Sequence, residues 1–384
     1  MRFDLSEDQQ EIQRAARDLL GGRATFAQLR TVVAEKDAEP TGMPDLSRTP
    51  GEDAALTAEL AELGWTGIAI PEEHGGQGLG LVELCAITEE LGYAVAAVPY
   101  LGTVTAALVV QHEGTEDQRG DWLPHLASGQ LRGATTYTGD RVPVPGATDA
   151  ALLLVGDPHG GPAALYAPGA GIAEDAEAVD PTRGHGRIPI PELDPEEELN
   201  PRGEWLGGTP TPSGAGFDRA AVVVAAELVG VVQRALDMTV AYVKERRQFG
   251  VPVGSFQAVQ HGAAQMLRDV AMARVLTYNA AWTADALSAA EDEGERARLA
   301  AELPVAAAMA KAAASDAGRT VTAAAVQLHG GIGFTWEADV HWLLKRAQVD
   351  AALLGGAGHH RRRIATRTSS VPVPEPTADE PATD

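Results

Sequence analysis

The stretch ERRQFGVPVGSFQAVQ, residues 245–260, combines side chains that can hold a ligand with a backbone that must turn sharply. A guanidinium at Arg246 and an aromatic ring at Phe249 lead into a turn rich in Gly and Pro, and two amides, Gln257 and Gln260, follow it. The runs on both sides have helical periodicity. Two interpretations are open: the segment closes a helix-turn-helix, or it forms a corner that binds a molecule.

Residues of other reactive types lack the spacing that their chemistry needs. Neither His329 nor His341 has a Cys, His or carboxylate at metal-ligand spacing, so we expect no metal site. No Gly-Xaa-Ser-Xaa-Gly elbow or Walker-type loop is present, which leaves hydrolase and nucleotidase functions without local support. The single cysteine, Cys85, excludes an internal disulfide framework and a thiol cluster. This is expected of a reducing compartment, and we expect a cytoplasmic protein.

Composition limits the kind of partner that the chain can have. Among 384 residues, 30 are Lys or Arg and 54 are Asp or Glu, which gives a formal net charge of −24. Such a charge repels nucleic-acid backbones and anionic membrane surfaces. No apolar run of about 18 residues, the length of a membrane span, appears. We therefore expect neither nucleic acid nor membrane among the partners.

The texture of the sequence changes twice along the chain. Up to residue 127 apolar residues recur at helical spacing, interrupted by the Gly-rich loop PEEHGGQGLG at 71–80. Short apolar runs bounded by Gly, Pro and Asp then indicate strands, and four long helical runs follow. The sequence predicts a mostly α protein with a central β domain. The expected units are an N-terminal α-helical domain at 1–127, a shortened β domain at 128–213, a four-helix bundle at 214–368 and a disordered acidic tail at 369–384.

Four segments in this order resemble the acyl-CoA dehydrogenase family, and together they span nearly the whole chain. They are FDLSEDQQEIQRAARDLL near the start, ELGWTGIAIPEEHGGQGLGLVELCAITEELG at 62–92, RRQFGVPVGSFQAVQ at 246–260 and VQLHGGIGFTWEADVHWLLKRA at 326–347. The resemblance implies the family fold, with a middle domain like a β-barrel. It also implies a flavoenzyme of lipid metabolism that oxidises an acyl-CoA thioester, holds FAD between subunits and passes electrons to a flavoprotein.

The resemblance assigns the residues that would grip the ADP half of a neighbour's FAD. Arg246 is similar to the guanidinium that meets the FAD pyrophosphate, a pairing that suits its planar fork of donors. Gln327, Gly330 and Gly331 resemble the family's site for adenine and ribose, where missing side chains let the cofactor lie against the backbone. The expected cofactor-binding residues are Arg246, Phe249, Gln257, Gln327, Gly330 and Gly331.

The residues that would act on the flavin ring and the substrate are missing. The family's catalytic carboxylate usually follows the last bundle helix, and the matching position here is Gly355. A minority of members carry it near the start of the first bundle helix, where this chain has Ala220, with Ala221 in place of a common Arg. Residues 132–150 also lack the family's flavin-ring patterns. The chain thus resembles the degenerate subunit of a heteromeric bacterial acyl-CoA dehydrogenase.

Three functions are compatible with a chain that keeps the residues for a neighbour's FAD but lacks those that act on the flavin ring and the substrate. In the first, the chain pairs with a complete subunit in a heterotetramer and completes its FAD site. In the second, it is a self-sufficient homo-oligomeric flavoenzyme whose base has moved to Glu227 or Asp350, although a carboxylate in the middle of an apolar helix more often pairs with a basic group. In the third, it is a non-catalytic scaffold for an acyl-CoA or a partner. HHRRR at 359–363 either meets phosphates of CoA or FAD or forms a solvated helix face.

Overall fold

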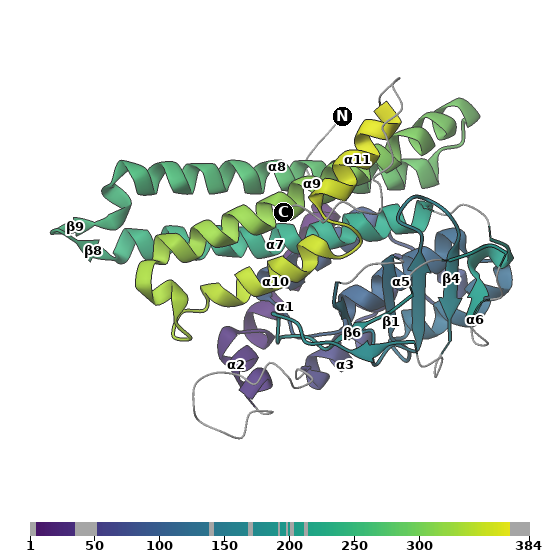
Figure 1. The fold of residues 1–384 in the computed structure, drawn as a ribbon, viewed down its shortest axis with the longest axis horizontal. Coiled ribbons are helices and arrows are strands. Elements are labelled where there is room, and N and C mark those ends of the chain that lie inside the picture. Colours follow the sequence, from purple (N-terminus) through teal and green to yellow (C-terminus); the bar gives the residue numbers. More distant parts are fainter. Residues whose placement is uncertain are drawn as a thin grey trace.

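A computed structural model of the chain describes residues 5–34, 52–137, 142–167, 172–190, 193–196, 199, 203–210 and 214–368. The acidic tail at 369–384, for which the sequence predicts disorder, lies outside the described residues. The described residues form three regions in chain order: a set of helices, two small sheets and a bundle of long helices (Figure 1).

The N-terminal region is helical and contains two deeply buried helices. Its helices are α1 (Glu7–Arg23), α2 (Phe26–Ala34), α3 (Ala54–Glu62), α4 (Leu81–Ala94), α5 (Tyr100–Glu113) and α6 (Glu116–Ala127), with the 3₁₀ turns η1 (Trp65–Gly67) and η2 (Glu72–His74). A capping box starts α1, because the Ser6 hydroxyl accepts from the Gln9 amide and the Gln9 side chain accepts from the Ser6 amide. α4 and α5 are apolar on most faces because both also pack on α7 (Ala215–Glu245).

The central region contains two small sheets. The first has the order β1 (Gly133–Tyr137), β3 (Leu152–Gly156), β4 (Ala163–Tyr166) and β7 (Gly203–Trp205), and the second has the order β2 (Val144–Pro145), β6 (His185–Arg187) and β5 (Glu174–Asp175). β1 and β3 are parallel, and the other pairs are antiparallel. A 3₁₀ turn, η3 (Leu206–Gly208), follows β7. Every residue of β1, β3 and β4 is buried, and α5 packs against β1 and β3.

The C-terminal region is a helical bundle. It consists of α7, α8 (Gln257–Ala289), α9 (Glu293–His329) and α10 (Val340–Ala352), followed by the shorter α11 (Ala357–Thr368). Figure 1 shows the long helices side by side, with the hairpin of β8 (Arg247–Gln248) and β9 (Val251–Pro252) projecting from one end. The turns η4 (Val253–Ser255) and η5 (Gly330–Phe334) lie at the same end. This architecture confirms the predicted fold class.

Two glycines let α4 and α7 cross in direct backbone contact. A Cβ added at Gly230 would lie 1.8 Å from the Glu89 carbonyl oxygen, and one at Gly92 would lie 2.1 Å from the Glu227 carbonyl oxygen. Neither position accepts a larger residue unless a helix moves. The contact fixes the N-terminal region against the centre of the bundle. No helix among the described residues is long and apolar enough to cross a membrane.

Candidate functional site

One end of the bundle brings together the six residues that the sequence predicts to bind a cofactor. They come from the end of α7 and the hairpin (Arg246, Phe249), the start of α8 (Gln257) and the end of α9 with its following turn (Gln327, Gly330, Gly331). The ends of α7 and α9 touch here, because the rings of Tyr242 and His329 stack with their centroids 4.5 Å apart. All six residues are exposed. The side chains of Arg246, Gln257 and Gln327 make no hydrogen bond to any described residue, so their polar groups remain available.

At two positions of this end the fold does not dictate the residue type. A Cβ added at Gly331 would meet nothing within 4 Å, and the backbone there is outside the left-handed region, so the fold does not require glycine. Phe249 and Gly250 form the two-residue loop of the hairpin, which requires positive φ at both residues, and Phe249 has φ of 52°. Its ring is 92% exposed and meets Phe256 edge-on with the centroids 6.3 Å apart, so the turn explains the backbone but does not require an aromatic side chain. The positive φ costs a residue with a side chain roughly 1–2 kcal/mol. An exposed aromatic ring held in a strained conformation is typical of a binding surface.

Both positions expected for the base are enclosed, and they lie away from this end. Gly355 is in the turn between α10 and α11 with φ of 87°, a conformation that favours glycine. A Cβ added there would lie 2.5 Å from Cδ2 of His359. Ala220 is fully buried in the first turns of α7. A carboxylate at residue 355 would therefore require both the backbone and His359 to move.

Stacked rings fill the junction of β1, α7 and α11 beside Gly355. Phe217 stacks on Tyr137 with the ring centroids 5.4 Å apart, and the ring of His359 is tilted against Tyr137 with the centroids 5.7 Å apart. Gly156, at the end of β3, makes room for Phe217, since a Cβ there would lie 2.5 Å from its ring. Burial lowers the pKa of His359 to about 4, so its imidazole is neutral at neutral pH.

The basic cluster at 359–363 forms the first turns of α11. Arg363 donates to Asp218 on α7 at 2.5 Å, and Arg361 pairs at the surface with Asp316 on α9. These two guanidiniums are therefore engaged with carboxylates of the same chain. The contacts also fasten α11 to the bundle.

Glu227 and Asp350, the two carboxylates considered as relocated bases, share a buried network with two arginines. Glu227 accepts from Nη1 of Arg183 at 3.0 Å and from Nη1 of Arg346 at 2.9 Å. Asp350 accepts from Nη2 of Arg183 at 2.5 Å. Asp180 accepts from Nε of Arg346 at 2.7 Å. All five side chains are almost inaccessible to solvent, and together they tie the β region to α7 and α10.

The network holds three carboxylates against two guanidiniums. Burial raises the pKa of Asp350 to about 7 despite the opposing effect of Arg183. Its Oδ2 atom has no hydrogen-bond partner among the residues that the structure describes. Burial also disfavours the charged form of Asp180, but Arg346 and Arg183 hold the pKa of that carboxyl well below its ordinary value. A proton on Asp350 would balance the charge of the network near neutral pH.

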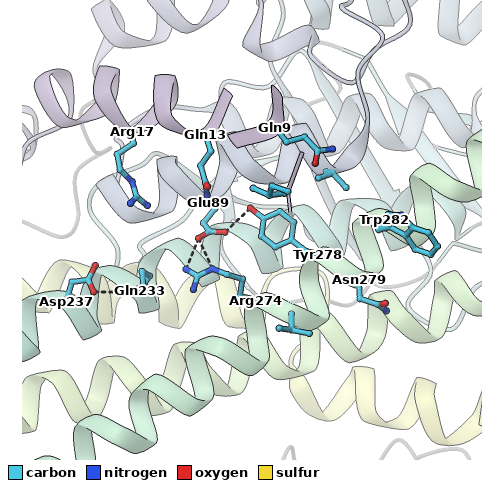
Figure 2. Close-up of a pocket in the computed structure, with 13 residues that line it drawn as sticks. Gln9, Gln13, Arg17, Glu89, Gln233, Asp237, Arg274, Tyr278, Asn279 and Trp282 are labelled. Carbon is cyan, nitrogen blue, oxygen red and sulfur yellow. Dashed lines mark hydrogen bonds and ion pairs between the residues drawn. The ribbon is translucent and has the colours of Figure 1, made fainter. Parts of the chain in front are cut away.

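A cavity of about 540 Å³ lies between α1, α4, α7 and α8 (Figure 2). In its wall Glu89 accepts from Arg274 at 2.7 Å and from the Tyr278 hydroxyl at 2.9 Å. Arg17 forms a bidentate pair with the buried Glu90. These pairs connect α4 to α8 and α1, so the charges lining this cavity serve the packing of the two regions.

A second cavity, of about 680 Å³, is bordered by the 71–80 loop, the start of α4 and the end of α8. Asp285 caps α4 there by accepting from the amides of Leu81 at 2.6 Å and Val82 at 3.0 Å. Burial raises its pKa to about 6. Neither cavity is lined by a position expected for the base. Within the described ranges, no group of three or more His, Cys, Asp or Glu is placed to hold a metal ion.

Comparison with known proteins assigns the family. The family model described as "Acyl-CoA dehydrogenase, N-terminal domain" matches residues 6–130. The family model described as "Acyl-CoA dehydrogenase, C-terminal domain" matches residues 208–369. The chain is 35% identical over 341 residues to the acyl-CoA dehydrogenase IpdE2 of Mycobacterium tuberculosis, with coverage of 88% of this chain and 95% of that protein. The chain belongs to the acyl-CoA dehydrogenase family.

Other acyl-CoA dehydrogenases are similar to this chain in sequence and in solved structure. FadE34 of Mycobacterium tuberculosis is 33% identical over 375 residues, a match that covers 93% of this chain but 48% of FadE34. A solved structure of a Tcur3481–Tcur3483 steroid ACAD variant is 31% identical with a TM-score of 0.73, and covers 94% of this chain and 97% of that chain. The ChsE4–ChsE5 complex from Mycobacterium tuberculosis is 25% identical with a TM-score of 0.75, covering 97% and 100%. Both structures are named for two proteins.

Family membership confirms the resemblance drawn from the four segments, and members of the family bind FAD. The exposed guanidinium of Arg246 and the open backbone at Gly331 fit the ADP half of that cofactor. Sequence reasoning gave no role to Arg346 or to the ring of Tyr137. Four of the five charged residues of the buried network were visible in the sequence, Asp180 and Arg183 in the motif DPTR and Glu227 and Asp350 as possible bases, but nothing in the sequence placed them together.

Proposed function

We propose that this chain is a subunit of a FAD-dependent acyl-CoA dehydrogenase that lacks the catalytic base and completes the FAD site of a complete partner subunit in a heterotetramer. The complex oxidises the α,β bond of an acyl-CoA thioester, and a separate flavoprotein accepts the electrons. The chain supplies cofactor contacts and the partner supplies the base.

A contrast between two glycines carries the proposal. At Gly355, where most family members place the base, a side chain would lie 2.5 Å from His359. At Gly331 a side chain would meet nothing within 4 Å. The chain therefore has little room for a side chain at the position from which the family's base acts on substrate. It has kept glycine at a position where only a molecule outside the chain needs the space.

Each residue at the exposed end has a definite task in this proposal. Bound FAD supplies the hydride acceptor for the acyl thioester. Arg246 pairs with the pyrophosphate, since guanidinium and phosphate form bidentate charge-assisted hydrogen bonds. Gln257 and Gln327 donate hydrogen bonds to the ADP half, Gly330 and Gly331 let it approach the backbone, and Phe249 covers it. A positioned base contributes about 10²- to 10⁴-fold to proton removal, so the partner's carboxylate is essential.

The named relatives support pairing. The two structures named for two proteins cover nearly all of this chain, and one of them is named as a steroid enzyme. FadE34 matches this chain over about half of its length, as expected if two chains of this kind were joined in one polypeptide. We therefore extend the proposal to a bulky, polycyclic acyl group as the substrate.

The buried network argues against a base at Glu227 or Asp350. A base must reach the proton that it abstracts, within about 2.6–3.2 Å or through one water. Glu227 instead accepts hydrogen bonds from two guanidiniums, and Asp350 from one, and both are shut off from solvent. The rings of Tyr137, Phe217 and His359 also pack against one another at the junction between the β region and the bundle, where the family resemblance implies the flavin ring. Both observations favour structural roles for these side chains.

The test is the flavin content of the purified protein. The chain is expressed alone and together with a complete acyl-CoA dehydrogenase from the same organism, and flavin absorption is compared with protein concentration. We expect a colourless chain alone, and a co-purified complex that holds FAD and oxidises an acyl-CoA. A chain that purifies alone with stoichiometric FAD and is reduced by an acyl-CoA would refute the proposal in favour of a self-sufficient enzyme.

Variants of the exposed end separate cofactor binding from simple association. In the complex, Arg246→Ala removes charge-assisted hydrogen bonds worth about 1.5–3 kcal/mol, so FAD should bind roughly 10- to 100-fold more weakly. Gln327→Ala should weaken it less. The matched control is Arg361→Ala, which removes another surface guanidinium, 60% exposed and paired with Asp316. A scaffold without FAD would respond identically to all three changes.

A further inference from the structure

One contact joins the two segments that make up the exposed end of the bundle. Tyr242 lies one turn before Arg246, whose amide donates to the Tyr242 carbonyl at 2.8 Å. His329 ends α9 and directly precedes Gly330. The two rings stack with centroids 4.5 Å apart and planes inclined by only 19°. Neither ring belongs to the exposed set, since Tyr242 is half-buried and His329 is buried.

We propose that Tyr242 and His329 are positioning residues, which hold the guanidinium of Arg246 and the open backbone at Gly330 and Gly331 in a fixed relation for an adenosine diphosphate group. The inference deepens the proposed function and rests on it. Neither side chain touches the cofactor. They act by keeping the ends of α7 and α9 at one spacing, so that the two halves of the surface grip one ligand together.

His329 is held firmly enough to serve as the fixed side of this contact. Its Nδ1 donates to the Ala325 carbonyl at 2.7 Å, which places the proton on Nδ1. Burial lowers the pKa of His329, so the ring is neutral and stacks without a charge to solvate. The turn η5 folds back over it, because a Cβ added at Gly333 would lie 3.0 Å from the His329 Cβ and 2.5 Å from the Val326 carbonyl. A shift of the ring would therefore shift the glycine turn.

The Tyr242 side is tied to the hairpin in the same way. The amide of Arg246 caps the end of α7, and the Val253 amide donates to the Arg246 carbonyl at 2.8 Å. A Cβ added at Gly254 would lie 2.9 Å from the carbonyl of Val243, next to Tyr242. The last turn of α7 and the hairpin thus move as one piece. A stacked pair of rings contributes about 0.5–1.5 kcal/mol, which corresponds to roughly 2- to 10-fold in the affinity of a ligand that needs both segments aligned.

The experiment measures the FAD dissociation constant of the co-purified complex by reconstitution with FAD, alongside its melting temperature. Tyr242→Ala and His329→Ala remove a ring and should weaken FAD by about 2- to 10-fold. Tyr242→Phe keeps the ring and should leave the constant unchanged. The double variant Tyr242→Ala/His329→Ala should be no weaker than the worse single variant, because both act through one contact.

A buried truncation elsewhere in the same helix separates positioning from stability. Leu236→Ala removes a core side chain from α7 two turns before Tyr242 and should lower the melting temperature without changing FAD affinity. If it weakens FAD as much as Tyr242→Ala does, the role of the stack is merely structural and the inference fails. If Arg246→Ala weakens FAD but the ring-removing variants do not, the inference fails while the proposed function stands. If Arg246→Ala has no effect either, the proposed function itself fails.

Discussion

The exposed end of the bundle and the buried network at its centre contain the same kinds of side chain in opposite circumstances. Arg246 is exposed, and its guanidinium has no partner among the described residues. Arg183 and Arg346 are buried, and carboxylates surround both. A buried charge must be paired, whereas an exposed one is solvated by water. The folded chain therefore depends on the pairing within the network, whereas the side chains of Arg246, Gln257 and Gln327 make no hydrogen bond to a described residue.

This difference separates structural from functional residues. A feature with a structural role in the fold, such as the arginines around Glu227, needs no catalytic role to account for it and is weak evidence for catalysis. A residue type that the fold does not require, such as glycine at residue 331 or an exposed aromatic ring at residue 249, points to something outside the chain. The second kind is concentrated at one end of the bundle, which supports the proposal that a cofactor shared with a partner subunit binds there.

The largest expected effect comes from breaking the network. Arg346→Ala removes hydrogen bonds to Asp180 at 2.7 Å and Glu227 at 2.9 Å, and leaves both carboxylates buried without that partner. Loss of one member of a buried ion pair destabilises by about 3–5 kcal/mol. We expect the free energy of unfolding, measured with urea, to fall by that amount or the chain to fail to fold.

The matched change at the exposed end should have almost no effect on the isolated chain. Arg246→Ala removes a guanidinium that is solvated, so the free energy of unfolding should change by less than about 0.5 kcal/mol. An equal loss in both variants would mean that Arg246 also serves the fold, and the contrast between the two regions would be wrong.

Sequence reasoning reached the exposed end because its signals are local. Arg246, Phe249 and Gln257 stand in one short segment, and Gln327 and the two glycines stand in another, so the resemblance of two short segments to the family was enough to predict them. The network could not be found in this way. Its members come from β-region, α7 and α10 segments that meet only in the folded chain, and nothing near Arg346 in the sequence shows that it is fully buried. For the same reason Glu227 could be weighed as a base but not placed beside its guanidiniums.

Substitutions of two glycines test the same contrast between a buried contact and the exposed end, with smaller expected effects on stability. Gly230→Ala places a Cβ 1.8 Å from the Glu89 carbonyl, so α4 and α7 must separate. Overpacking of this kind destabilises by about 1–3 kcal/mol. Gly331→Ala meets nothing within 4 Å and should leave stability unchanged in urea unfolding, while lowering the FAD content of the complex. Normal FAD content in the Gly331→Ala complex would remove the main support for a cofactor at that end.

The network should also make stability depend on pH. Burial raises the pKa of Asp350 from 3.8 to about 7 in the folded chain. The folded state therefore retains a proton that the unfolded state releases, and the stability due to this group, complete below pH 3.8, is lost as the pH rises to about 7. The slope is at most about 1.4 kcal/mol per pH unit. The charged groups that face Asp350 are Arg183 and Asp180 of the β region, Glu227 of α7 and Arg346 of α10.

Asp350→Asn removes this titration but keeps the size of the side chain. The difference in free energy of unfolding between wild type and variant should change steadily from the acid end of that window to its neutral end, with the variant gaining relative stability as the pH rises. Urea unfolding at a series of pH values provides the measurement. Parallel curves would show that Asp350 is ionised throughout, and the picture of a network balanced by one proton would be wrong.

At Phe249 we expect a small effect in which function and stability oppose each other. Phe249→Asn places in the left-handed region a residue that tolerates it, and little buried surface is lost because the ring is 92% exposed. The isolated chain should therefore become slightly more stable, by up to about 1 kcal/mol, while its complex loses FAD affinity. Val95 provides the control, since it is left-handed too, with φ of 51°, but buried at the end of α4. Val95→Gly relieves the same strain yet gives up a buried side chain worth about 1.5–3 kcal/mol, so it should destabilise. If Phe249→Asn destabilises as Val95→Gly does, the strained ring serves the fold of this chain and not a molecule bound outside it.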